Sequence, residues 1–563
     1  MTITHSVSIA YSDIFDDYEK IDIKSLLKDV PSKSALEIIG HFSAQIHTRE
    51  KDSKRQIEFL KIWLGRLPNS VHKKINELIY DMLKQNNVRI NFINNITNLL
   101  LSEYILNNYN SLERVPNLTP EQELNLFKAY LWCSQQWTVK QESKENQEKI
   151  TLDELAALFI RIQFPYQELL EFKDFRMQFI KATFFFKFCE SNEVFKEYLK
   201  IFYAEHKVSS WEEYLTLLLN IYIRKFEELR TSSITKINDD HKSVQEFVRQ
   251  YCVNPVGFKM SDDFLSLREK PVYEIENNNF LFLNLNLIVD KIFQGVQFAL
   301  SKALIKNGAK YKGVPIERFD HFKSIYGEEL SEKGLFYSIM KYTFEKNDYV
   351  KIDGNTLKAT LKNGEPDFYI RDKNKVYLFE YKDVIINAQT KHSYDFNVIH
   401  SELLKKFVTN EHGDAKGISQ LVNSIVKIRQ GDFNGLDNID KDNVIIYPIV
   451  VFTDFVLNIV GVNYLLNKEM RKLMATKKID SHNVKNLILI DLDILVKFQD
   501  LFRSKYLKIN NCLNEYIEHT TIKTPEIKKL STFNMFIHDK TANLKDYTPK
   551  LLFTEASKLL NKD

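Results

Sequence analysis

The first half of the chain carries apolar residues at the spacing of amphipathic helices. Apolar side chains that recur every three or four positions fall on one face of an α-helix. This spacing predicts helices in four segments, 57–67, 71–83, 93–107 and 121–132. Thr119-Pro120-Glu121 has the composition of a helix start, with Thr as the cap and Pro in the first turn. Residues 1–255 are therefore expected to form an all-α domain, in which the polar stretch 140–149 is a loop or linker.

Beyond residue 265 the pattern changes to alternation with a period of two. Residues 272–275 and 280–285 alternate on either side of Asn277-Asn278-Asn279, which predicts a β-hairpin. An apolar helix with one internal glycine, Gly295, is expected over 287–303. We expect the hairpin and this helix to form a connecting segment, residues 256–310.

Residues 311–563 mix helical and strand patterns. Helices are predicted over about 328–344, 394–408 and 418–429. Asp353-Gly354 is a hairpin turn pattern, and the strands expected beside it continue through 356–361 and the Asn363-Gly364 turn as a three-stranded meander. Two continuous apolar runs, 444–453 and 486–492, are typical of strands that are covered on both faces. The whole chain is thus expected to be an α+β multidomain protein, with an α/β domain at 311–563.

The most informative motif of the chain is Pro366-Asp367, followed by Glu380-Tyr381-Lys382. Asp367 opens an apolar run, a polar loop (RDKNK) follows, and residues 376–382 then alternate, so the two acids and the lysine fall on adjacent strands. Val376 and Leu378 share one strand face with Glu380 and Lys382. An acid and a lysine at the end of an apolar face are costly to bury unless they pair or bind a cation.

Two carboxylates that hold a divalent metal, beside a lysine near an attacking water, make a site that hydrolyses phosphodiesters. The alternative is an ordinary surface hairpin, with Asp367 in a turn and a solvated Glu380–Lys382 pair of little energetic value. An acid-x-Lys triplet is common in a chain with 75 acidic and 78 basic residues, so the weight of the motif comes from its place in the element order.

This arrangement resembles the PD-(D/E)xK superfamily of restriction endonuclease-like nucleases. The resemblance implies a core of helix, three-stranded meander, helix and strand. It also implies Mg²⁺ or Mn²⁺ held by Asp367 and Glu380, with Lys382 orienting the attacking water. A Mg-dependent deoxyribonuclease is the implied activity, and the large helical domain resembles bacterial defence nucleases of the restriction type. DNA is the implied partner, and because many enzymes of this fold cut as dimers, a homodimer is an open alternative.

The family usually adds an acid from the first core helix. Glu332 is the best-placed candidate for this further catalytic acid and metal ligand, because it lies one turn into the apolar stripe, while Glu328 and Glu329 remain alternatives. Gln420 resembles the Gln that some branches place beside the active site. Ser424 stands where the recombination-type exonuclease branch has Tyr, so membership of that branch is in doubt.

Composition narrows the remaining classes only slightly. The net charge of +3 neither favours nor excludes nucleic acid. The four cysteines form no CxxC pair, the N-terminus lacks the features of a signal peptide, and no apolar run would span a bilayer, so a cytoplasmic protein without a membrane partner is expected. The helical domain is a candidate for targeting, regulation or binding of a partner protein. The alternative to a nuclease is a nucleic-acid-binding or scaffold protein on an inactive nuclease fold.

Overall fold

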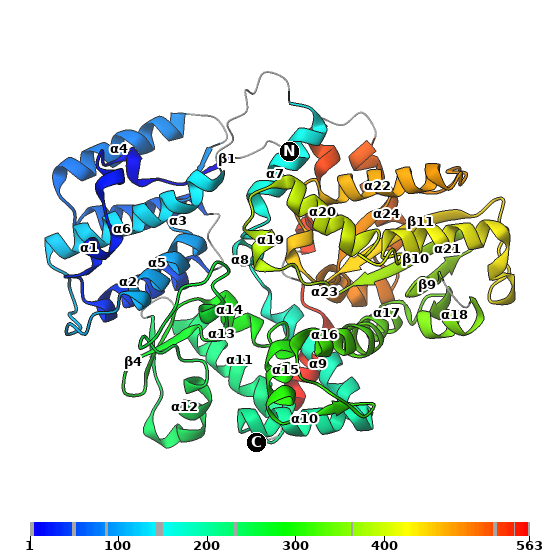
Figure 1. Ribbon diagram of the computed structural model, residues 1–563, viewed down its shortest axis with the longest axis horizontal. Helices are drawn as coiled ribbons and strands as arrows, with labels where there is room; N and C mark the ends of the chain where they lie inside the picture. Colours follow the sequence, from blue (N-terminus) through cyan, green and yellow to red (C-terminus); the bar gives the residue numbers. More distant parts are fainter. Residues whose placement is uncertain are drawn as a thin grey trace. The chain divides into compact units, whose positions relative to one another are not determined.

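The structure is a computed structural model, and its mixed α/β chain folds as two compact units that are interleaved in sequence (Figure 1). The first unit contains 1–145, 169–174 and 206–294, and the second contains 146–168, 175–205 and 295–563. These units do not follow the ranges 1–255, 256–310 and 311–563, because two helical segments from the first half of the chain belong to the second unit. The structure describes residues 5–47, 52–84, 88–141, 150–228, 233–361, 364–521, 526–544 and 547–560.

The helices predicted in the first unit are present. They are α3 (Ser53–Leu64), α4 (Asn69–Lys84), α5 (Asn95–Asn107) and α6 (Pro120–Thr138), preceded by α2 (Ser32–Ile46). The predicted start of α6 is confirmed, because Thr119 accepts a hydrogen bond from the Gln122 backbone N–H at 3.3 Å. The predicted loop or linker at 140–149 lies mostly outside the described residues.

The prediction that residues 1–255 form an all-α domain is wrong, because strands of two small sheets lie in this part of the chain. The strands β1 (His5–Val7) and β2 (Val88–Ile90) pair in parallel. The predicted hairpin is confirmed as β4 (Val272–Glu276) and β5 (Asn279–Phe282), and β3 (Ile234–Lys236) adds to it. Strands β1, β2 and β3 have three residues each, which is too short for an alternating pattern to be detected.

The prediction of a single helix over 287–303 is wrong. The structure has α14 (Leu285–Asp290) and α15 (Val296–Lys306), with Gly295 as the N-cap of α15. The two helices are assigned to different units, since the division falls between residues 294 and 295.

The second unit is built on a five-stranded sheet with the order β12-β11-β10-β9-β8. The strands β8, β9 and β10 pair antiparallel, and β10, β11 and β12 pair in parallel. Their bounds are Val350–Asp353, Phe368–Asp372, Lys375–Lys382, Ile445–Phe452 and Ile488–Asp491 for β8 to β12. Figure 1 shows the sheet between the helices α21 (Ile418–Gln430) and α22 (Val462–Thr476) and the helices α17 (Tyr337–Phe344) and α23 (Leu492–Arg503).

Residues 356–361, predicted as a strand of the meander, are helical. Helix α18 (Gly354–Leu361) connects β8 to β9, and Asp353 caps it by accepting hydrogen bonds from the Thr356 backbone N–H (3.1 Å) and hydroxyl (3.0 Å). Leu357 and Leu361, four residues apart, are both buried, which is a helical spacing. The antiparallel order β8-β9-β10 is present, with a helix in place of the first predicted turn. Asn363, part of the second predicted turn, lies outside the described residues.

Helices from the first half of the chain complete the core of the second unit. Ile160 of α7 (Leu152–Gln163) and Phe164 are fully buried in the cluster that covers Val376 and Leu378 of β10. Lys181 of α9 (Phe175–Ser191) forms a buried ion pair of 2.5 Å with Asp493. No helix in the described part of the chain combines the length and the apolar character that crossing a bilayer requires.

A fragment that begins at residue 256 should therefore lack a stable second unit. Loss of α7 exposes the apolar cluster around β10, and loss of α9 leaves the largely buried Asp493 without its cation, which is strongly destabilising. We expect the 256–563 fragment to be insoluble, or to unfold in urea without a cooperative transition, while the full chain unfolds cooperatively. A soluble fragment with a sharp urea transition would contradict this division of the chain.

Candidate functional site

Asp367 lies directly before β9, and its side chain is held against the end of β10. The Tyr381 backbone N–H donates a hydrogen bond of 2.7 Å to Asp367 Oδ2. On its other side, the Asp367 carbonyl oxygen accepts a hydrogen bond of 2.8 Å from the Gly354 backbone N–H. The hairpin register, with Phe368 opposite Phe379, brings residue 367 beside residues 380 to 382.

Glu380 and Lys382 point to the same side of β10, as the alternation of the strand predicts. Lys382 Nζ donates a hydrogen bond of 2.9 Å to Glu380 Oε1. The Glu380 side chain is 0% exposed and that of Lys382 is 15% exposed, so this is a buried pair and not the solvated pair of the alternative reading. Glu380 Oε2 is also buried, and it has no hydrogen-bond partner among the described residues. A buried carboxylate oxygen without a partner calls for a cation, a water or a proton.

Glu332 reaches the same place from a helix on the other side of β10. It lies on a π-helix, η5 (Tyr326–Phe336), which is continuous with α16 (Phe319–Ile325) before it and α17 after it. Tyr337 donates a hydrogen bond of 2.7 Å from its hydroxyl to Glu332 Oε1. The same hydroxyl would lie 2.5 Å from a Cβ built on Gly354, and that Cβ would lie 3.0 Å from the Asp367 carbonyl oxygen, so Tyr337 brings Glu332 toward Asp367.

The other two acids of this helix are engaged elsewhere. Lys333 Nζ lies 3.2 Å from Glu328 Oε1 and 3.1 Å from Glu329 Oε1. Of the three candidate acids, Glu332 is therefore the one whose hydrogen-bond partner, Tyr337, also approaches the backbone of Asp367.

Gln420 joins the group through Lys382. Its Oε1 accepts hydrogen bonds from the Gly417 backbone N–H (2.7 Å) and from Lys382 Nζ (3.3 Å). Gly417 has a positive φ of 37°, and a Cβ at this position would lie 3.1 Å from Lys382 Cε. The start of α21 thus packs directly against the lysine side chain.

The site holds more negative groups than one lysine compensates. Burial and then the charge of Asp367 raise the pKa of Glu332 to about 8. Burial also raises the pKa of Asp367 and of Glu380, and Lys382 only partly opposes this. The pKa of Lys382 is raised, because the attraction of Glu380 and Asp367 outweighs the effect of burial. Without a further cation, such a group of carboxyls retains protons near neutral pH.

A bound divalent metal would neutralise the negative charge of these acidic side chains, and carboxylate oxygens are suitable ligands for it. The described residues contain no group of three or more His, Cys, Asp or Glu side chains arranged to hold a metal ion. Glu332, Asp367 and Glu380 therefore do not form a complete three-ligand metal site. Mg²⁺ is usually held by one or two carboxylates, with waters and substrate phosphate as the other ligands. Asp367 and Glu380 are two carboxylates of this kind, and Glu380 Oε2 has no hydrogen-bond partner among the described residues.

Sequence reasoning missed Tyr337 and Gly417 as parts of the site. Tyr337 lies five residues after Glu332, a spacing at which an α-helix does not bring side chains together but a π-helix does. Gly417 could have been found as a glycine directly before a predicted helix.

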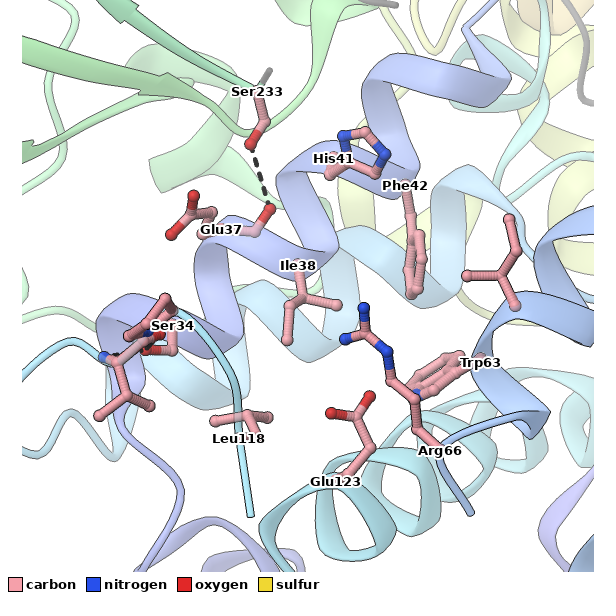
Figure 2. Close-up of a pocket in the computed structure, with 13 residues that line it drawn as sticks. Ser34, Glu37, Ile38, His41, Phe42, Trp63, Arg66, Leu118, Glu123 and Ser233 are labelled. Carbon is pink, nitrogen blue, oxygen red and sulfur yellow. Dashed lines mark hydrogen bonds between the residues drawn. The ribbon is translucent and has the colours of Figure 1, made fainter. Parts of the chain in front are cut away.

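The first unit contains a separate cavity of about 280 Å³, which shares no residue with this site (Figure 2). Its walls are helix α2, Trp63 and Arg66, the segment 115–118 and Glu123 of α6. Burial raises the pKa of Glu123, which Arg66 and the Trp63 indole partly offset. Ser233 at its edge donates a hydrogen bond of 3.3 Å to the Glu37 carbonyl oxygen (Figure 2).

Comparison of the chain with protein-family models, with curated proteins and with solved structures finds no match.

The raised pKa of Glu332 makes the stability of the metal-free protein depend on pH. Its folded-state pKa of about 8 lies above the ordinary value of 4.5, so between these values the folded state binds the extra proton. The free energy of unfolding should then fall as pH rises from 5 to 8, by up to about 1.4 kcal/mol per unit from this group. In urea unfolding with chelator at pH 5, 6.5 and 8, Glu332→Gln should show a weaker fall than the wild type. Parallel curves for the two proteins would contradict the burial of Glu332.

Proposed function

We propose that the second unit is a metal-dependent nuclease domain that hydrolyses phosphodiester bonds of DNA. The proposal extends to an endonuclease that acts in bacterial defence against foreign DNA. The observation that carries it is the meeting of Asp367, Glu380 and Lys382 in one buried group in which a carboxylate oxygen of Glu380 has no partner among the described residues.

The order of elements supports the same proposal. A long helix precedes three antiparallel strands, helices follow, and β11 then joins β10 in parallel. This is the order of the PD-(D/E)xK core that the motif resembles. The insertion of α18 between β8 and β9 and the π-helical form of η5 depart from a plain version of that core.

Each residue has a distinct task in this proposal. Asp367 and Glu380 hold Mg²⁺ or Mn²⁺, which when bound polarises the phosphate and lowers the pKa of a coordinated water. Lys382 keeps its proton, since the surrounding carboxylates raise its pKa, and it stabilises the negative charge that develops on the phosphate oxygens. Gln420 fixes the Lys382 amine by accepting its hydrogen bond. Glu332 adds a third carboxylate, whose hydrogen bond from Tyr337 sets its direction.

An inactive nuclease fold that binds nucleic acid or serves as a scaffold is the second candidate. It is favoured by the existing Lys382–Glu380 bond, which partly satisfies the site without a metal, and by the lack of a three-ligand cluster among the described residues. The first unit is proposed as the part that selects a target or a partner protein, because it contains none of these residues. Cleavage assays separate the two candidates.

Asp367→Ala and Lys382→Ala should each reduce cleavage of supercoiled plasmid by about 100-fold or more, because each removes a group that acts on the reacting phosphate. Matched controls are Asp372→Ala and Lys375→Ala, a facing pair at the opposite end of the same hairpin, which should cut like the wild type. Cleavage is measured with Mg²⁺ or Mn²⁺ and with chelator, at equal concentrations of protein that is folded by circular dichroism. Wild-type cutting by either site variant, or undiminished cutting in chelator, would refute the assignment.

A further inference from the structure

The acid-bearing helix has an unusual form that neighbouring elements must maintain. The π-helix η5 runs from Tyr326 to Phe336, whereas π-helical geometry mostly occurs as single turns inside α-helices, frequently at functional sites. The Tyr337 backbone N–H bonds to the Glu332 carbonyl oxygen, five residues back. Because this form is rare in isolation, its persistence over 11 residues requires support from packing.

Helix α9 supplies a close contact near the C-terminal end of this π-helix. A Cβ built on Gly334 would lie 2.5 Å from Cδ1 and 2.9 Å from Cγ of Phe188. A flip of the Phe188 ring would not relieve the second contact, since Cγ lies on the axis of that rotation. An alanine at residue 334 would therefore require the Phe188 side chain or one of the two helices to shift.

The π-helix is connected to Asp367 through Tyr381. The Phe336 and Tyr381 rings stack with centroids 4.7 Å apart and an angle of 7° between their planes. The Ser331 and Tyr381 hydroxyls are joined by a hydrogen bond of 2.8 Å. The backbone N–H of the same Tyr381 holds the Asp367 carboxylate. A shift of η5 therefore acts on both Glu332 and Asp367.

A second connection runs through Tyr337. Its hydroxyl bonds to Glu332, and a Cβ on Gly354 would lie 2.5 Å from that hydroxyl oxygen. Gly354 in turn donates its backbone N–H to the Asp367 carbonyl oxygen. The two acids are thus set relative to each other by close contacts on both sides.

We propose that α9 is part of the catalytic unit and that Phe188 is a positioning residue. Its contact with Gly334 fixes the place of η5 against β10, and so the separation of Glu332 from Asp367. This inference rests on the proposed nuclease function and deepens it. The sequence predicted that residues 175–191 belong to a targeting domain, whereas this inference assigns their helix to the active site.

The first test is Gly334→Ala, compared with Gly327→Ala in the same π-helix. A Cβ on Gly327 meets no atom within 4 Å, and Ala is a better helix former than Gly, so Gly327→Ala should cut plasmid normally. Gly334→Ala should lower kcat by about 10- to 100-fold with little change in KM, because displacement of the acids affects the reaction more than substrate binding. Equal activity of the two variants would overturn the inference.

The second test asks whether Phe188 is the cause. In a Phe188→Ala background, space opens beside residue 334, so adding Gly334→Ala should change kcat by less than about two-fold. An equally large loss in both backgrounds would show that the contact does not act through Phe188.

The third measurement does not depend on cleavage. Hydrogen exchange of the Tyr381 amide, followed by mass spectrometry on the full chain, should become faster in Gly334→Ala than in Gly327→Ala, because the bond to Asp367 loosens. Unchanged exchange in Gly334→Ala would overturn the inference. If the wild-type protein cuts no DNA, the proposed function fails, and the exchange comparison alone then decides whether α9 positions Asp367.

Discussion

The burial of charged groups beside β10 is the constraint on which the rest of the second unit depends. Glu380 is fully enclosed, and its neighbours Asp367 and Glu332 are also acids. Burying a carboxylate costs several kcal/mol unless it is paired and hydrogen-bonded (about 2 to 7 kcal/mol even for a neutral polar group). One lysine and a few hydrogen bonds do not compensate the burial of three carboxyls, so this arrangement lowers the stability of the folded chain. Such a cost is typical of sites that bind a cation or carry out catalysis.

Elements that are far apart in sequence hold these charged side chains in place. The Tyr381 backbone steadies Asp367, the start of α21 steadies Lys382 through Gln420, and the π-helix brings Glu332 to its place. Behind the π-helix, Phe188 of α9 lies so close that a Cβ on residue 334 would be 2.5 Å from its ring.

The site hairpin could be predicted from sequence because its pattern is local. Alternation from Val376 to Lys382 gives both the strand and the face, and the two apolar runs that became β11 and β12 are equally plain. Residues 356–361 show where a turn pattern misleads. Asp353-Gly354 can start a hairpin or cap a helix, and the buried spacing of Leu357 and Leu361 decides for a helix.

Other features had no local pattern to reveal them. The π-helix has the apolar spacing of an ordinary helix, so the approach of Tyr337 to Glu332 was not visible. The assignment of α7 and α9 to the second unit depends on contacts between residues more than 100 positions apart, such as Lys181 with Asp493. Long-range packing of this kind leaves no mark in periodicity, and it is what separates the predicted domain ranges from the observed units.

Mn²⁺ binding decides whether Asp367 and Glu380 together hold a divalent cation. Titration of metal-free protein, followed by the electron paramagnetic resonance of free Mn²⁺, reports binding whether or not the protein cuts DNA. The wild type and the Asp372→Asn control should bind Mn²⁺ alike, while Asp367→Asn and Glu380→Gln should each weaken binding by about ten-fold or more. Equal Mn²⁺ affinity in the wild type and in Asp367→Asn would show that Asp367 is not a metal ligand.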